Sequence, residues 1–194
     1  MEYSNEFIES ITQEIIRIIS LKMEKHPYHN FEHALDVYRA IQIYTKKTGL
    51  NDKEKFLLSI AALFHDIIYI DGAKDNEENS ALKAESFMEE KGFSKQDITI
   101  VKSLIRATKF PTNPKTVMEM LICDADLDHL GTDECKKISL KLKKEWGVSD
   151  EKKWWTMEKE FMKKHHYYSS VAKKLRNHKK AQNLEEIKAI LKTL

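Results

Sequence analysis

The chain is poor in the residues that build disulfide frameworks and phosphate-binding loops. Its 194 residues include only two cysteines, Cys123 and Cys135, which do not form a CxxC pair. Two thiols cannot make a disulfide framework, so a reducing compartment is the simpler interpretation. All five glycines follow segments with helical spacing, where a helix C-cap favours glycine. No Gly-rich loop remains, which excludes a P-loop and a dinucleotide-binding fingerprint.

Long apolar runs and a leader-like N-terminus are also missing. The most apolar segment, residues 56–64, is too short to span a bilayer. The first ten residues contain early acids and no basic stretch ahead of an apolar one. We therefore expect a cytoplasmic protein that does not enter a membrane.

The net charge of +2 conceals an uneven distribution. Residues 1–97 carry 12 Lys/Arg against 18 Asp/Glu, and residues 98–194 carry 21 against 13. The lysines of the second half alternate with apolar residues at helical spacing, so we interpret them as solvated helix faces. A helical protein that binds nucleic acid through residues 136–180 is an alternative, but no helix-turn-helix or base-stacking motif supports it. We expect no nucleic-acid partner.

Apolar residues recur at helical spacing along the whole sequence, and no convincing strand alternation is present. The pattern predicts an all-α, single-domain bundle of about eight or nine helices. Residues 1–194 form this domain, with a core at about 26–131 and C-terminal helices at 132–194 packing on it. The expected later helices cover residues 75–91, 95–108, 115–130, 133–146, 150–166 and 169–192, with Ser94 and Asp150 as N-caps.

A histidine and an aspartate lie side by side in the most apolar segment. Residues 56–70, FLLSIAALFHDIIYI, predict a buried helix that contains His65 and Asp66. A buried carboxylate without a partner is very unfavourable, and a cation is one such partner. A satisfied core histidine beside a capping aspartate is the alternative.

Two further segments supply the same kinds of side chain. Residues 26–37 place His29 and His33 four positions apart, near the start of a helix. Asp36 follows on the same face, where it could hold the second ring nitrogen of a ligating histidine. Residues 122–131, ICDADLDHLG, end a helix with alternating acids, among them Asp124 and Asp126. The EF-hand pattern fails there, because the required glycine and closing glutamate are missing.

Together the three segments resemble the HD superfamily of metal-dependent phosphohydrolases, whose pattern is H…HD…D. That pattern falls on His33, His65–Asp66 and Asp126. Residues 28–37 also resemble the YHNxxHAxDV motif of the cyclic-nucleotide phosphodiesterases, which share the helical core. Small bacterial predicted HD phosphohydrolases carry motifs similar to NEENSA (residues 76–81) and DADLDHLG (residues 124–131).

The resemblance implies a role for each matched residue. His33, His65, Asp66 and Asp126 become metal ligands, and we expect Asp66 or Asp126 also to assist proton removal from a water. His29 becomes the general acid. Asp124 remains an alternative to Asp126, which precedes Leu127 as in the ADL of the phosphodiesterases.

The chain also departs from the family pattern. Ile67–Ile68–Tyr69 replaces the lysine that many members carry after HD, and no histidine occurs from residue 67 to 125. Members with two metals have extra histidines there, so we expect one firmly bound metal, with Glu77 or Glu78 as possible substitutes. Two imidazoles and two carboxylates suit Mn, Fe, Co, Ni or Zn, with Mg also possible.

We therefore expect a hydrolase of a phosphomonoester or phosphodiester, with a small phosphorylated substrate, and we favour a nucleotide. The alternative is an HD module that senses a nucleotide or metal without turnover. Arg106 and Lys109, near the last aspartate in sequence, are candidates for binding phosphate, or else solvated charges. His165, His166 and Tyr168 are expected in an aromatic cluster, or alternatively beside the substrate. A homodimer is possible.

Overall fold

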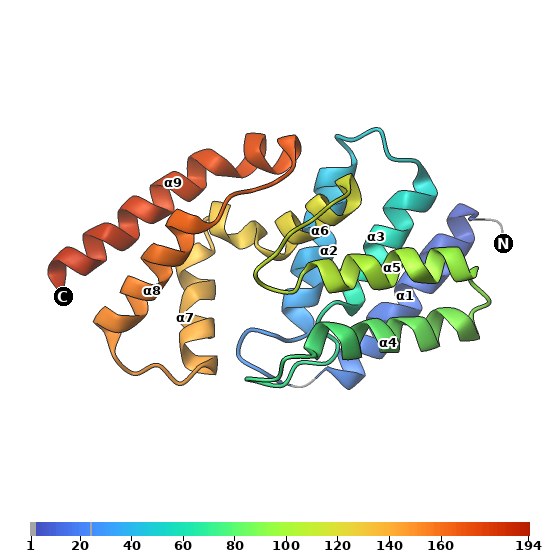
Figure 1. The fold of residues 1–194 in the computed structure, drawn as a ribbon, viewed down its shortest axis with the longest axis horizontal. Helices are drawn as coiled ribbons and strands as arrows, with labels where there is room; N and C mark the ends of the chain where they lie inside the picture. The colour runs from blue at the N-terminus through green and yellow to red at the C-terminus, as the bar shows by residue number, and fades with distance from the viewer. Residues whose placement is uncertain (1–2, 24) are drawn as a thin grey trace.

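A computed structural model describes residues 3–23 and 25–194, so Met1, Glu2 and Glu24 of the expected domain lie outside the described residues. Within this part of the chain there are nine α-helices, one short 3₁₀ helix (η1) and no strand, which confirms the all-α prediction. Figure 1 shows helices α1–α6 gathered at one end of the molecule and α7–α9 at the other. The helices are α1 (Asn5–Lys22), α2 (Phe31–Thr45), α3 (Asp52–Phe64), α4 (Asn76–Glu90), α5 (Lys95–Ala107), α6 (Val117–Asp126), η1 (Asp128–Gly131), α7 (Cys135–Glu145), α8 (Glu151–Lys164) and α9 (Ser170–Thr193).

Helix α3 is the centre of the N-terminal bundle. It is buried on all sides from Phe56 to Phe64, because α1, α2, α4, α5 and α6 pack around it. Its start is fixed by a capping box, in which Asn51 and Glu54 satisfy each other's backbone N–H groups. This helix lies at the centre of the large hydrophobic core.

Helices α7–α9 form a second, smaller core. Its buried residues are Leu130, Cys135, Trp154, Trp155, Met162 and Ile187. Helix α8 packs on α9, and α9 packs along η1, the short turn that follows α6. The second core therefore meets the N-terminal bundle at the segment around α6 and η1.

Polar contacts fasten α9 and the segment before it to the α6–η1 segment. The carboxylate of Asp124 accepts the backbone N–H groups of Tyr168 and Ser169 at 2.7 and 2.8 Å. Arg176 donates to both oxygens of Asp128 at 2.6 and 3.0 Å. These contacts link the end of α6 and the start of η1 to α9 and to the segment before it.

Glycine 131 allows α9 to approach closely. A Cβ added there would lie 2.5 Å from the Cβ of Arg176 and 2.7 Å from its carbonyl oxygen. Its backbone φ is not positive, unlike that of Gly72, Gly92 and Gly147, which do adopt the left-handed region. The expectation of a left-handed helix cap is therefore wrong for Gly49 and Gly131, and close helix contact explains the glycine at position 131.

Two predicted helix boundaries also need correction. The helix expected over residues 56–70 ends at Phe64, so His65 is its C-cap and Asp66 lies in the following turn. The helix expected over residues 115–130 begins at Val117 and stops at Asp126, where Leu127 leaves the helical region with φ −103° and ψ 20°. The predicted N-caps Ser94 and Asp150 are confirmed, since each accepts a backbone N–H three residues on. Across the described residues, no helix has both the length and the apolar character needed to cross a bilayer.

Candidate metal centre

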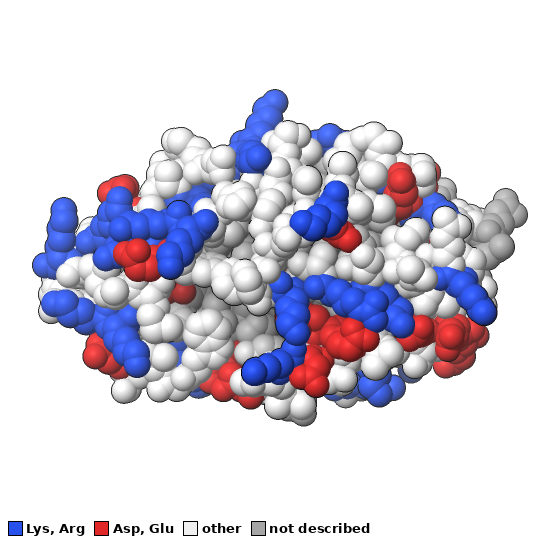
Figure 2. Space-filling view, in the orientation of Figure 1, with Lys and Arg blue, Asp and Glu red and all other residues white. Residues whose placement is uncertain are grey.

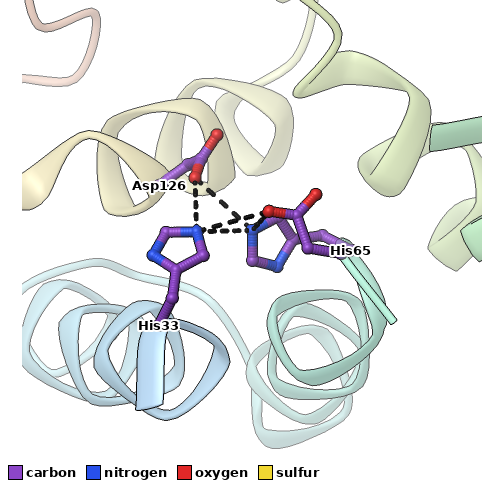
Figure 3. Close-up of side chains that lie close together, drawn as sticks. His33, His65 and Asp126 are labelled. Atoms are coloured by element: carbon purple, nitrogen blue, oxygen red, sulfur yellow. Dashed lines mark hydrogen bonds and ion pairs between the residues drawn. The ribbon is translucent and has the colours of Figure 1, made fainter. Parts of the chain in front are cut away.

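Four side chains from three segments converge at one point. His33 lies in the first turn of α2, His65 and Asp66 follow the end of α3, and Asp126 ends α6. The Nε2 atoms of His33 and His65 are 3.1 Å apart. Asp126 Oδ1 is 3.2 Å from His33 Nε2 and 3.4 Å from His65 Nε2 (Figure 3). Asp66 Oδ2 lies 3.4 and 3.2 Å from the same two nitrogens.

The tautomer of His65 directs a lone pair into this cluster. Its Nδ1 lies 2.8 Å from the carbonyl oxygen of Ala62, which can only accept a hydrogen bond. The Nδ1 atom therefore carries the proton, and in the neutral ring Nε2 is the unprotonated nitrogen. The early end of α3 makes this contact possible, since His65 turns back onto the last helical turn.

The spacing of the four donor atoms fits a divalent metal ion. All four lie within 4.8 Å of one another. Ligand atoms about 2.1 Å from an ion are about 3.0 Å apart at octahedral angles and about 3.4 Å apart at tetrahedral angles. The nitrogen–oxygen and nitrogen–nitrogen distances of 3.1–3.4 Å fall in this range. Two imidazole nitrogens with two carboxylate oxygens form a donor set for Mn, Fe, Co, Ni or Zn.

The charges within the cluster favour ionised carboxylates. Burial acts to raise the pKa of Asp66 and Asp126, but His33 and His65 outweigh burial and lower both values. Burial likewise acts to lower the pKa of the two imidazoles, but the carboxylates raise both. Both aspartates therefore carry the negative charge that a cation requires.

His29 lies beside the cluster and is held from the C-terminal region. Its Nδ1 forms a hydrogen bond with Glu145 Oε1, at the end of α7. The other carboxylate oxygen of Glu145 accepts the backbone N–H groups of Tyr28 and His29 at 2.7 and 3.0 Å. The face of the His29 ring stacks on the ring of Tyr69, with ring centres 3.7 Å apart and an angle of 13° between the ring planes. Both the position and the tilt of the His29 ring are thus fixed.

Glu145 is the residue of this site that sequence reasoning missed. It is 116 residues from His29 and is one of many acids on exposed helices. Burial acts to raise its pKa, but His29 and the two backbone N–H groups outweigh burial and lower the pKa to about 2. Glu145 is therefore ionised at neutral pH.

The NEENSA motif has a structural role in holding the loop that carries Tyr69. The Asn76 side chain accepts from the backbone N–H of Ile70 at 3.0 Å and donates to its carbonyl at 2.9 Å. Ser80 bonds the backbone N–H and carbonyl of Ile68 at 3.2 and 3.3 Å. These contacts position the loop after Asp66, and with it the ring that stacks on His29.

A cavity of about 410 Å³ opens beside the cluster. Asp66, Asp126 and His29 all line it, together with residues of α7 and α8. A second cavity of about 230 Å³ reaches the cluster from the side of α2, and Tyr28 and His129 line both. Burial and the nearby His33 lower the pKa of His129 to about 4, so this imidazole is neutral at pH 7.

Other residues singled out from the sequence lie outside the cluster. Asp124 is buried and bonds backbone N–H groups ahead of α9, so the structure brings Asp126 and not Asp124 to the histidines. Asp36 is exposed and pairs with Arg39 at 2.8 Å, which does not fit the role of holding a histidine ligand. The spacing of three residues from His33 therefore does not bring its carboxylate to the cluster.

The two predicted phosphate-binding cations have other partners. Arg106 makes two hydrogen bonds to Glu78, at 2.6 and 2.8 Å, and Lys109 donates to the carbonyl of Lys74. Neither residue lines either cavity at the cluster, although Glu77 lines the larger one. His165 packs against Phe161 and Tyr167, as expected for an aromatic cluster, and it also lies outside the cavity lining.

Comparison with known families agrees with this geometry. The sequence model of the HD domain family matches residues 30–131, which is 102 of the 194 residues. The chain belongs to the HD domain family, whose members are typically metal-dependent phosphohydrolases. No curated protein matches the chain. The matched region contains His33, His65, Asp66 and Asp126, whereas His29 and Glu145 lie outside it.

Proposed function

We propose that this protein is a metal-dependent phosphohydrolase that cleaves a phosphomonoester or phosphodiester of a nucleotide. One observation carries the proposal. Two of the four donor residues that suit a metal, Asp66 and Asp126, line a single cavity with the oriented His29, and this cavity is large enough for a small ligand. Membership of the HD domain family supports the same class of reaction.

Asp66 and Asp126 have a double role in this proposal. His33, His65, Asp66 and Asp126 would hold a divalent ion, which would supply a bound water of lowered pKa and polarisation of a phosphoryl oxygen. Each aspartate directs one oxygen toward the two imidazoles, and the other oxygen of Asp126 points away from them (Figure 3). A second carboxylate oxygen placed beside an attacking water can accept its proton.

His29 supplies the proton to the departing oxygen. The ionised Glu145 accepts from Nδ1, which leaves Nε2 as the nitrogen available for proton transfer. Stacking on Tyr69 prevents the ring from turning away from the cavity. In this arrangement Glu145 acts as a positioning residue, because it acts through His29.

A sensor that binds a nucleotide or metal without turnover is the second candidate. The same four ligands and the same cavity would serve it. The oriented His29 favours an enzyme, because a fixed imidazole with one free nitrogen contributes to proton transfer and adds nothing to the ligand set of the metal.

Metal analysis followed by activity measurements would test the proposal. The protein is stripped with a chelator, reloaded separately with Mn, Fe, Co, Ni, Zn or Mg, and assayed with p-nitrophenyl phosphate, bis-p-nitrophenyl phosphate and nucleoside monophosphates. We expect at least one metal to restore turnover. Asp66→Asn should lose about 1000-fold or more in activity and most of its bound metal, while Asp36→Asn, the exposed control, should retain both.

Two results would contradict the proposal. A fully active Asp66→Asn variant after metal reloading would remove the metal from the mechanism. Wild-type protein that binds one metal tightly and yet hydrolyses no phosphate ester would favour the sensor.

A further inference from the structure

Aromatic and aliphatic side chains form most of the larger cavity beside the cluster. Tyr69 and Phe110 come from the N-terminal bundle, and Trp146, Trp154 and Phe161 come from the region of α7 and α8. Phe110 and Trp146 are 68% and 43% exposed, which is high for large apolar residues and places them at the rim. Flat apolar walls of this kind bind a planar ring by stacking.

The charged residues that line this cavity are all acidic apart from the histidines. They are Asp66, Glu77, Asp126 and Glu158, and no lysine or arginine occurs among the described lining residues. Figure 2 shows a hollow near the centre of the face, between α8 and α5, with mostly uncharged atoms around it and charged side chains toward α4 and α5. The cavity therefore offers no side-chain cation to a chain of several phosphates, and the cluster at one end is the place for a single phosphoryl group.

Glu158 is the one buried carboxyl of this cavity that the proposed mechanism leaves unused. It lies in α8 and is 8% exposed. Its hydrogen-bond partner is the Ser139 hydroxyl, which itself accepts from Trp154 Nε1 at 2.9 Å. Burial raises the pKa of Glu158, and Ser139 offsets this only in part. Glu158 makes no ion pair with any described residue, and the other residues of α8 that line the cavity, Trp154, Met157 and Phe161, are apolar.

We propose that Glu158 selects a nucleoside phosphate whose base carries an exocyclic amino group. The base stacks on the aromatic walls, its amino group donates to Glu158, and its single phosphoryl group lies at the metal cluster. This inference rests on the proposed function and adds its substrate class. A carboxyl oxygen accepts an N–H in either protonation state, whereas an ionised carboxylate repels the carbonyl oxygen that replaces the amino group in inosine or uridine.

Matched pairs of nucleotides would test the inference. The monophosphates of adenosine and inosine differ mainly by the amino group, as do those of cytidine and uridine. Binding is followed by quenching of tryptophan fluorescence, since Trp146 and Trp154 line the cavity, and turnover is followed by kcat/KM. We expect the amino-bearing member to be preferred by about 10-fold or more in both measurements, and adenosine triphosphate to be a poorer substrate than the monophosphate.

Variants on α8 make the test specific. Glu158→Leu should reduce both preferences to about 1-fold, and Glu158→Gln, which retains the side-chain volume, should reduce or invert them because an amide can donate to a carbonyl. Turnover of p-nitrophenyl phosphate, which has no amino group, should fall by a smaller factor than turnover of adenosine monophosphate. Glu160→Gln is the matched control, because Glu160 lies on the same helix but is exposed and paired with lysines.

The outcomes separate this inference from the proposed function. Equal binding and turnover of the matched nucleotides by the wild-type protein would overturn the role of Glu158, even if p-nitrophenyl phosphate were hydrolysed. Unchanged preferences in both Glu158 variants would do the same. Discrimination in binding without turnover of any ester would support Glu158 and overturn the hydrolase.

Discussion

Helices α1–α6 and helices α7–α9 are stabilised by different kinds of contact. The first set surrounds α3, which is buried on every side by apolar neighbours. The second set has a small core of its own. It is joined to the first by apolar residues at the start of α9, such as Ala172, and by several polar groups, among them Asp124, Asp128 and Asn183. Asn183 donates to the carbonyl oxygens of Leu130 and Thr132 at 3.0 and 2.8 Å.

The two sets of helices also contribute different residues to the site. The proposed metal ligands all come from the apolar bundle, where packing fixes their positions. The C-terminal helices contribute Glu145, which orients His29, and Glu158 with its aromatic neighbours. Changes in the C-terminal region should therefore affect proton transfer and substrate choice more than metal binding.

The largest effect on stability is expected at Asp128. Removing this carboxylate leaves Arg176 without its ion pair and Tyr44 without the acceptor of its hydroxyl. We expect Asp128→Ala to lower the free energy of unfolding by about 3 kcal/mol, measured by urea denaturation. Hydrogen exchange should show faster exchange in α9 than in α3, because α3 is held by apolar packing.

A double variant provides the control for Asp128. Adding Arg176→Met removes the unpaired cation, so the double variant should recover part of the lost stability. A loss of less than about 1 kcal/mol in Asp128→Ala, with no regional difference in exchange, would show that polar contacts are not what holds the C-terminal helices.

The next largest effect is expected at Glu145 and concerns turnover. Glu145→Gln removes the negative charge that fixes His29, so we expect kcat to fall by about 100-fold for an ester with an alkoxide leaving group. For a p-nitrophenyl ester, whose leaving group needs no proton, the loss should be much smaller, at about 5-fold or less. Metal content should remain that of the wild type, since Glu145 is not in the cluster.

Glu134→Gln is the matched control for Glu145. Glu134 immediately precedes α7 but is exposed and pairs with Lys137. An equal loss with both kinds of leaving group in Glu145→Gln would indicate general damage to the site in place of a defect in proton donation.

The sequence predicted the residues of the cluster because burial and charge conflict there. His65 and Asp66 follow an apolar run, and a carboxylate in that position needs a cation or another partner. The helical pattern likewise predicted the all-α fold. The position of the helix end was not predictable, because Ile67 and Ile68 continue the apolar pattern past Phe64.

Long-range polar contacts account for the parts of the site that the sequence did not predict. Nothing local distinguishes Glu145 or Glu158 from the other acids of the lysine-rich helices, and their partners are far away in sequence or belong to a cavity wall. The sequence made Arg106 a candidate for binding phosphate, but its partner in the structure is Glu78, which lies 28 residues earlier. Sequence spacing indicates which residues share a helix face, but it does not indicate which helices meet.

A smaller effect on stability is expected at Gly131. Its Cα lies so close to Arg176 that an added methyl group would displace α9, and we expect Gly131→Ala to cost about 2 kcal/mol in thermal or urea unfolding. Gly49 is the matched control, because a Cβ there meets nothing within 4 Å and its φ is not positive. Gly49→Ala should be neutral or slightly stabilising, by at most about 1 kcal/mol. Equal effects of the two changes would mean that α9 is not packed tightly on η1.

The smallest effect is expected at Asp36, which belongs to the apolar bundle but contributes to neither packing nor the cluster. Its carboxylate is exposed and pairs only with Arg39 among the described residues. Asp36→Ala should change the free energy of unfolding by less than about 0.5 kcal/mol, as is common for exposed ion pairs. Metal affinity, measured by competition with a chelator, should change by less than about 2-fold, because no second carboxylate holds His33 from this side. A 10-fold loss of metal affinity would instead assign Asp36 the role of supporting a histidine ligand.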